Sequence, residues 1–200
     1  MRTMINAIAG VLALSTWSAH SDASCFTGGS ESGALEFSGA VEGTEFTGSF
    51  GDFSVEYCFG DDDRPETGSI SVVVALASAD SDNADRDETL KGPEFFAVDM
   101  HPEAEWQSAA IEAAGEGYRA QGELTLKAIT RPQTIRFTLS ADGEDLLAQG
   151  RFTMSGSAEV DRQRFEVGTG EFADPEFVRN RVDVAFDLRL EQQDRQGTAE

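Results

Sequence analysis

Alternation between apolar and polar residues with a period of two is the feature that most constrains the fold of this chain. It is clear in residues 35–37, 70–76, 118–126, 135–139 and 182–190. Because successive side chains of a strand point to opposite faces, each segment presents one apolar face and one polar face. This pattern is typical of half-buried antiparallel strands, so we expect an all-β fold.

Two further segments carry strand signals. Between Phe46 and Phe59 the apolar positions change parity at Gly51 and Asp52, which predicts a bulge or a turn that re-aims the strand. Another strand is expected to place four residues on its inner side: Ala148, Gly150, Phe152 and Met154. Roughly eight strands separated by regular turn signals fit one antiparallel domain.

The alternation does not decide between two packed sheets and a closed barrel. An eight-stranded barrel is just wide enough to be filled by side chains or to hold one slender ligand. Glycines interrupt the Phe-rich inner positions at Gly39, Gly48, Gly122 and Gly150. These glycines either leave room for a tunnel along the axis or relieve bends in the strands.

Helix is indicated only between residues 85 and 98. Asp85 and Glu88 resemble a capping box, and Pro93 limits the helix to a turn or two. The segments 24–33 and 192–200 are polar and are expected to be loose.

The first residues have the features of a secretory signal peptide, which we assign to residues 1–23. Residues 7–14 form an apolar run too short to span a bilayer, and Ser21 and Ala23 are the small residues that a cleavage site requires. The mature domain is expected to cover residues 24–200. An N-terminal membrane anchor is the alternative.

Cys25 and Cys58 are the two cysteines of the chain. In an oxidising compartment such a pair is expected to form a disulfide, since a zinc site needs four ligands and the mature chain has few others to offer. Free thiols, or acylation of Cys25, are the alternatives.

Charge and histidine content exclude several functions. The formal net charge of −22 argues against nucleic-acid binding and against membrane docking through a basic patch. His101, the only histidine after residue 23, precedes Pro102, which predicts a turn at a strand entrance. No Gly-x-Ser-x-Gly motif accompanies it, so we expect neither an enzyme nor a metal site. Residues 83–94 have part of the spacing of a calcium loop, but Glu88 stands where glycine is needed, and a solvated loop is preferred.

Several motifs occur in an order that resembles the YceI family of bacterial periplasmic proteins, including the subgroup also found fused to membrane cytochromes of the b type. The similarity runs from about Gly33 to Leu190. The matching segments are Leu35-Glu36-Phe37, Gly48-Ser49-Phe50, RDETLKGPEFFAVDMHP from Arg86 to Pro102, Thr130-Arg131-Pro132 and residues 161–172.

The resemblance implies an eight-stranded antiparallel lipocalin-like barrel with a short helical turn near residues 85–98. It implies that the barrel encloses a long isoprenoid chain, either a polyprenyl lipid or the tail of a respiratory quinone. It also implies a periplasmic carrier, often a dimer, with no catalytic residues and no cofactor other than a bound lipid. An accessory partner of a membrane cytochrome and a structural barrel without ligand are the alternatives.

The candidate lining residues are the inward-facing apolar positions of the strands, together with two phenylalanines expected to gate the mouth. They are Leu35, Phe37, Phe46, Phe50, Val72, Val74, Phe95, Phe96, Leu124, Leu126, Phe137, Phe152, Val184 and Phe186. Arg86, Asp87 and Arg131 are expected either to hold a polar head group at the rim or to tie a loop to a strand. Because the net charge is so negative, a neutral, quinone-like head is expected in preference to a pyrophosphate.

The chain departs from the family pattern at two places. Many members have a histidine near the first strand, where this chain has Ser32-Gly33-Ala34, and an aspartate that commonly follows the second-strand aromatic is replaced around Tyr57-Cys58-Phe59. These departures concern recognition of the head group.

Overall fold

The computed structural model describes residues 24–60, 64–140 and 148–192, and the account that follows is of these residues. The predicted signal peptide, residues 1–23, lies outside the described residues.

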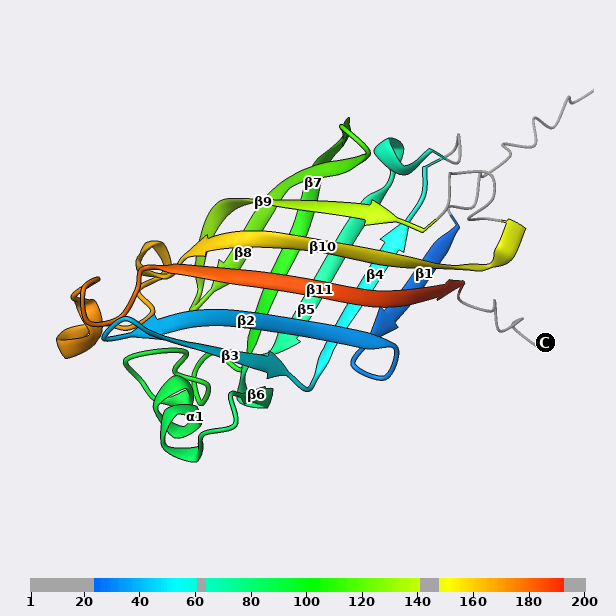
Figure 1. Cartoon of the computed structure of the whole chain (residues 1–200). Coiled ribbons are helices and arrows are strands. Elements are labelled where there is room, and N and C mark those ends of the chain that lie inside the picture. The colour runs from blue at the N-terminus through cyan, green and yellow to red at the C-terminus, as the bar shows by residue number, and fades with distance from the viewer. Residues whose placement is uncertain (1–23, 61–63, 141–147, 193–200) are drawn as a thin grey trace, which may run out of the picture.

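Eight antiparallel strands close into a barrel (Figure 1). They are β1 (Cys25–Gly29), β4 (Phe53–Cys58), β5 (Ser69–Ala75), β7 (Glu103–Ala114), β8 (Gly117–Leu126), β9 (Ile129–Leu139), β10 (Arg151–Asp161) and β11 (Arg181–Gln192). The ring is closed by β1, which pairs with β4 on one side and with the end of β11 on the other. The predicted barrel is confirmed.

Three more strands extend the wall beyond the ring. β2 (Gly33–Val41) follows β1 along β11, β3 (Thr44–Phe50) pairs with β2, and the short β6 (Ala79–Asp80) pairs with β3. β3 and β4 are separated by Gly51 and Asp52 and pair with different neighbours. The predicted re-aiming of the strand at these two residues is therefore confirmed.

The predicted helix is α1 (Ala84–Lys91), and Gly92 and Pro93 follow it. Its cap differs from the prediction: the side chain of Asn83, and not Asp85, accepts a hydrogen bond of 3.0 Å from the backbone N–H of Arg86. The described part of the chain also contains four 3₁₀ helices, η1 (Pro65–Thr67), η2 (Leu76–Ser78), η3 (Arg162–Phe165) and η4 (Gly170–Ala173).

The sequence prediction missed three strands, β1, the two-residue β6 and β7. Residues 24–33 were expected to be loose, but they include β1, which the disulfide and the fully buried ring of Phe26 hold in the wall. β7 was missed because a register shift between Ser108 and Ala110 interrupts its alternation.

The start of β10 also differs from the prediction. Phe152 and Met154 are buried, as expected, but Ala148 and Gly150 precede the strand. Gly150 has a φ of 64°, a left-handed conformation that suits a turn and not a strand.

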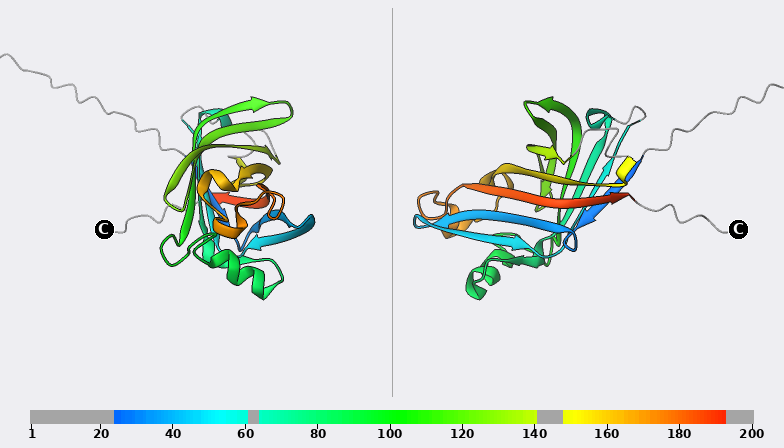
Figure 2. Two further views of the ribbon diagram at one scale, coloured as in Figure 1. Left: turned by 90° about the vertical axis from the view of Figure 1, so that its left-hand side faces the viewer. Right: turned by 45° about the vertical axis from the view of Figure 1, so that its right-hand side comes forward.

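The apolar core has two parts. One cluster surrounds Tyr57 and includes Phe26, Phe59 and Phe152; the other lies toward α1 and includes Leu90 and Phe165. The end-on view shows the η3–η4 segment (orange) across the barrel end and α1 (green) beside it (Figure 2, left). One end of the barrel is therefore packed with aromatic rings, and the other is covered by helical segments.

The predicted disulfide between Cys25 and Cys58 is confirmed. The two residues are directly paired between β1 and β4, with Cα atoms 4.0 Å apart. The bond therefore fixes the first strand of the ring to its neighbour. Among the described residues, no helix has the length and apolarity needed to cross a membrane.

Candidate binding cavity

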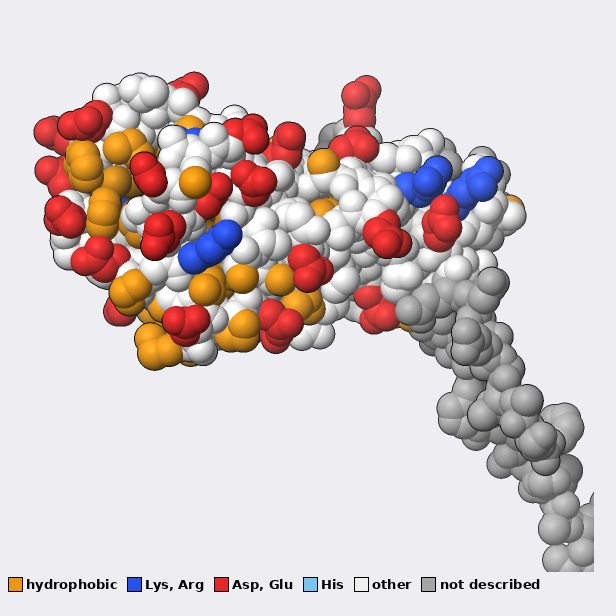
Figure 3. Space-filling view, turned by 90° about the horizontal axis from the view of Figure 1, so that it is seen from below, with side chains coloured by type: hydrophobic (Ala, Val, Ile, Leu, Met, Phe, Trp, Pro, Cys, Tyr) orange, Lys and Arg blue, Asp and Glu red, His pale blue; other side chains and the backbone are white. Residues whose placement is uncertain are grey.

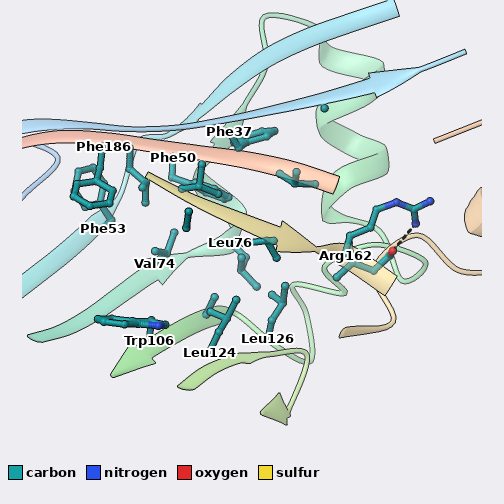
Figure 4. A pocket seen from close by; sticks show the side chains of 18 of the residues that line it. Phe37, Phe50, Phe53, Val74, Leu76, Trp106, Leu124, Leu126, Arg162 and Phe186 are labelled. Carbon is teal, nitrogen blue, oxygen red and sulfur yellow. Dashed lines mark hydrogen bonds between the residues drawn. The ribbon is translucent and has the colours of Figure 1, made fainter. Parts of the chain in front are cut away.

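The barrel contains a cavity of about 240 Å³ whose walls are almost entirely apolar. Phe37 and Phe50 lie on one side of it, and Trp106 and Leu124 lie on the opposite side (Figure 4). The walls come from the barrel strands, from the β2–β3 extension and from the segment around α1. The interior is therefore suited to a ligand that presents hydrocarbon and few polar atoms.

Most of the predicted lining residues do line this cavity. They are Leu35, Phe37, Phe46, Phe50, Val72, Val74, Phe95, Phe96, Leu124, Leu126, Val184 and Phe186. The parity of the alternation places those that lie on strands inside the barrel, whereas Phe95 and Phe96 lie between α1 and β7. Ligand contact by any of them stays a prediction.

Phe137 and Phe152 have the expected inward parity but are not among the residues that line the cavity. Phe137 packs edge-on against Tyr57, with ring centroids 6.3 Å apart, and Phe152 lies 5.0 Å from Phe26. Both rings belong to the packed end of the barrel. The alternation along a strand predicts which face a residue lies on, but it does not predict where along the barrel axis that residue lies.

The list of candidate lining residues left out several wall residues, although most have inward parity on strands and Met154 was expected on the inner side of its strand. The cavity is also lined by Phe53, Val55, Leu76, Leu90, Ala104, Trp106, Gln133, Ile135, Met154, Ala158, Val160, Arg162, Val167, Val182 and Leu188. Ala104 and Trp106 were not predicted because they belong to β7, which the sequence prediction missed. Arg162 has the same parity as Ala158 and Val160, so the alternation along the chain could have assigned its side chain to the interior of the barrel.

The glycines leave less room than a tunnel would need. A Cβ on Gly48 would lie 2.5 Å from the ring of Phe37, and a Cβ on Gly122 would lie 2.6 Å from the ring of Trp106. Aromatic rings therefore cover these two glycines and occupy the space that the sequence suggested was open. Gly39 does line the cavity.

Arg162 closes the cavity at the η3 end. It is 3% exposed, and its five N–H groups all donate to main-chain carbonyls. Nε donates to Arg179 (3.2 Å), Nη1 to Val167 (2.6 Å) and Gly168 (2.8 Å), and Nη2 to Phe172 (2.7 Å) and Val178 (2.8 Å).

The environment of Arg162 defines its role. Burial lowers the pKa of its guanidinium, and carbonyl dipoles stabilise the positive charge that remains. Because every donor is used, this side chain has none left for a ligand. It instead holds the segment after η3 across the barrel end.

Arg86 and Asp87 hold α1 against the extended wall. Arg86 donates to the hydroxyl of Ser81 (2.7 Å) and to its carbonyl (2.7 Å), and its guanidinium lies 4.3 Å from the ring centroid of Phe46. Asp87 accepts from the Ser81 hydroxyl (2.6 Å) and N–H (2.9 Å). The Ser81 hydroxyl is the main reason why the pKa of Asp87 is lowered.

These contacts match the second predicted role of the two residues, which was to tie a loop to a strand. Arg131 lies exposed on β9, with Nη1 donating to the carbonyl of Thr130 (2.9 Å). A role of the three residues at a ligand head group stays a prediction.

Within the described residues, no group of three or more His, Cys, Asp or Glu side chains is arranged to hold a metal ion. His101 lies in the connection just before β7, as its place before Pro102 predicted.

A closed antiparallel barrel with a hollow, apolar interior defines a lipocalin-like barrel protein. Residues 18–190 match the model of the YceI-like domain, and the chain belongs to this family. The resemblance found in the sequence is therefore confirmed, and the family is one of binding domains.

Three proteins illustrate the similarity. A UPF0312 protein of Yersinia pestis is 32% identical over 122 residues, which is 61% of this chain and 63% of that protein. BcnA of Burkholderia cenocepacia superimposes with a TM-score of 0.69 at 26% identity, covering 78% of this chain and 95% of BcnA. A polyisoprenoid binding domain from Saccharophagus degradans has a TM-score of 0.59 at 11% identity, covering 86% of this chain and all of that domain, and shows the fold alone.

Proposed function

We propose that the barrel binds a long isoprenoid lipid, either a polyprenyl chain or the tail of a quinone, and carries or sequesters it. The single observation that carries this proposal is the almost wholly apolar cavity inside a closed barrel. An isoprenoid chain presents only hydrocarbon, so its affinity comes from burial of apolar area, at about 25 cal/mol per Å². The polyisoprenoid binding named for the Saccharophagus degradans domain supports the same ligand class.

The size of the cavity limits how much of the ligand it holds. Its volume of about 240 Å³ lies just below the range of roughly 300–1,000 Å³ that is common for small-molecule pockets. A long chain would therefore be enclosed over part of its length. The remainder would leave the barrel, and Phe95 and Phe96, which follow α1, are candidates to gate that exit.

The proposed location is the periplasm. The Cys25–Cys58 disulfide supports an oxidising compartment. Delivery to a membrane cytochrome and assembly into a homodimer rest on the resemblance to the family. A structural barrel without ligand would have a filled core, and the cavity argues against that alternative.

Substitution of one wall residue tests the proposal. Val74 faces the cavity, whereas its neighbour Val73 has the opposite parity and pairs with Ser54 and Glu105. A tryptophan at position 74 is expected to displace about two methylene groups of the ligand from the cavity. This displacement reduces the binding free energy by about 1.6 kcal/mol, which lowers the affinity roughly fifteenfold. V74W should therefore bind a polyprenyl alcohol at least about tenfold more weakly, while V73W should bind it like the wild type.

Native mass spectrometry with polyprenyl alcohols of increasing length gives the affinities, and thermal melting checks that both variants fold. In the wild type, affinity should rise with each added isoprene unit and then level off once the cavity is filled. Equal binding by V74W and V73W, or a wild-type protein that binds no alcohol of any length, would overturn the proposal.

A further inference from the structure

The cavity ends inside the barrel, and on five strands it ends between two successive inward-facing residues. The last wall residues of these strands are Val55 on β4, Val72 on β5, Ile135 on β9, Met154 on β10 and Leu188 on β11. The next inward-facing residues, two positions further along each strand, are Tyr57, Ile70, Phe137, Phe152 and Leu190, and they do not line the cavity. All of them are buried in the cluster that packs the barrel end beside the disulfide.

Three aromatic rings of this layer hold one another in place. The ring of Tyr57 lies edge-on to those of Phe137 and Phe152, with centroids 6.3 and 6.1 Å away, a favourable arrangement for aromatic pairs. The Tyr57 hydroxyl donates to the carbonyl of Pro65 (2.7 Å). Tyr57 is 0% exposed, and the two phenylalanines are 3% exposed. These three rings, Tyr57, Phe137 and Phe152, form an aromatic floor where the cavity ends.

A glycine beside the floor keeps the space above it open. Gly156 on β10 is paired with Phe137 on β9 and with Phe186 on β11. A Cβ on Gly156 would lie 2.9 Å from the Cβ of Phe137 and would clash with the ring of Phe186. Because Gly156 has no side chain, the ring of Phe186 lies against the wall and lines the cavity without closing it. The floor, and not Phe186, is therefore what ends the cavity.

The opposite end of the cavity has the features of an entrance for hydrocarbon. Phe95 and Phe96 line the cavity there, and Met100, in the same connection between α1 and β7, is 70% exposed. On the face seen from below, apolar side chains gather over the half of the barrel that α1 covers (Figure 3). A chain that enters past these residues points its far end at the aromatic floor.

We propose that the aromatic floor sets the length of isoprenoid chain that the barrel encloses, with Phe137 as the length-determining residue. Each isoprene unit that enters the cavity buries further apolar area and raises the affinity. Once the end of the chain meets the floor, further units stay outside the cavity and add little. This inference rests on the proposed function and adds to it a specificity for chain length.

Phe137 is the floor ring that can be removed with the least damage to the barrel. Removal of Tyr57 would leave the carbonyl of Pro65 without its partner. Phe152 packs against Phe26 of the ring-closing strand β1, with centroids 5.0 Å apart. Phe137 packs only edge-on against Tyr57 and stacks on the half-buried ring of Tyr118, with centroids 5.4 Å apart. Its removal therefore lowers the floor and leaves the ring closure and the Tyr57 hydrogen bond in place.

The test uses native mass spectrometry with isoprenoid alcohols of increasing length, from geraniol upward. F137A removes about six carbon atoms from the floor, slightly more than one isoprene unit. An enlarged apolar cavity accepts hydrocarbon in preference to water. F59A is the matched control: Phe59 is equally buried and belongs to the same cluster, but it stacks on Tyr57, with centroids 4.6 Å apart, and does not line the cavity. F137L is a milder version of the same change, and thermal melting checks the folding of all three variants.

In the wild type, affinity should level off at one chain length. F137A should level off about one isoprene unit later and bind that longer alcohol at least about tenfold more tightly than the wild type does. The longer alcohol should also raise the melting temperature of F137A more than that of the wild type, because it binds only the folded, enlarged cavity. F137L should show a smaller gain in the same direction, about threefold. F59A should level off at the wild-type length.

Each contrary result has a distinct meaning. If folded F137A levels off at the wild-type length, the floor is refuted and the isoprenoid cavity stands. If F137A does not fold, F137L decides in the same way. If F59A shifts the length as F137A does, loosening of the whole packed end sets the length, and the role of Phe137 is refuted. If the wild type binds no alcohol of any length, the proposed function fails as well.

Discussion

Replacement of Arg162 by methionine should destabilise the protein and loosen the covered end of the barrel. The side chain makes five hydrogen bonds to the carbonyls of residues 167, 168, 172, 178 and 179. Hydrogen bonds to charged groups contribute about 1.5–3 kcal/mol each, so the five together set an upper limit of roughly 7–15 kcal/mol. In the variant, the freed carbonyls can reach water as the segment moves outward. We therefore expect a loss of about 3–5 kcal/mol in the free energy of unfolding, as is common when one partner of a buried charged group is removed.

Urea denaturation followed by circular dichroism measures this loss, and hydrogen exchange locates it. Amides of the segment after η3 should lose protection in R162M, while those of β8 keep theirs. R164M is the matched control, since Arg164 belongs to the same 3₁₀ helix but is exposed, and it should change stability by less than about 0.5 kcal/mol. A loss below about 1 kcal/mol in R162M, or unchanged exchange after η3, would refute the reasoning.

Two other predictions concern the packed end of the barrel. Burial raises the pKa of Tyr57 well above its ordinary value, and its hydroxyl donates to the carbonyl of Pro65 (2.7 Å). Because the phenol ionises first in the unfolded chain, stability that is present below about pH 10 should fall by about 1.4 kcal/mol per pH unit above it. Y57F should remove most of this slope in alkaline urea titrations, and an unchanged slope would exclude Tyr57 as its source. Replacing Cys25 and Cys58 by alanine should lower the free energy of unfolding by about 3–4 kcal/mol, since the bond spans 33 positions; equal denaturation midpoints for the variant and the oxidised wild type would contradict this.

Most of the strands, and the faces they bury, could be predicted from the sequence. Period-two alternation is a local property, so Phe37, Val74 and Leu124 could be assigned to the interior without knowledge of their neighbours. The short helix before Pro93 could be predicted for the same reason from the local proline signal, although its N-cap is Asn83 and not the Asp85 of the predicted capping box. Strand β7 was not predicted because the register shift after Ser108 interrupts this local pattern.

The sequence by itself determined which side chains face inward, because that depends on the alternation along each strand. Only the tertiary structure decided where along the axis each one lies: Phe37 lines the cavity, whereas Phe137, with the same parity, packs against Tyr57. It also decided that the pairing between β9 and β10 ends at Ile135 and Ala158, although both strands continue. These positions depend on register between strands that are distant in sequence, and no local pattern in the chain specifies that register.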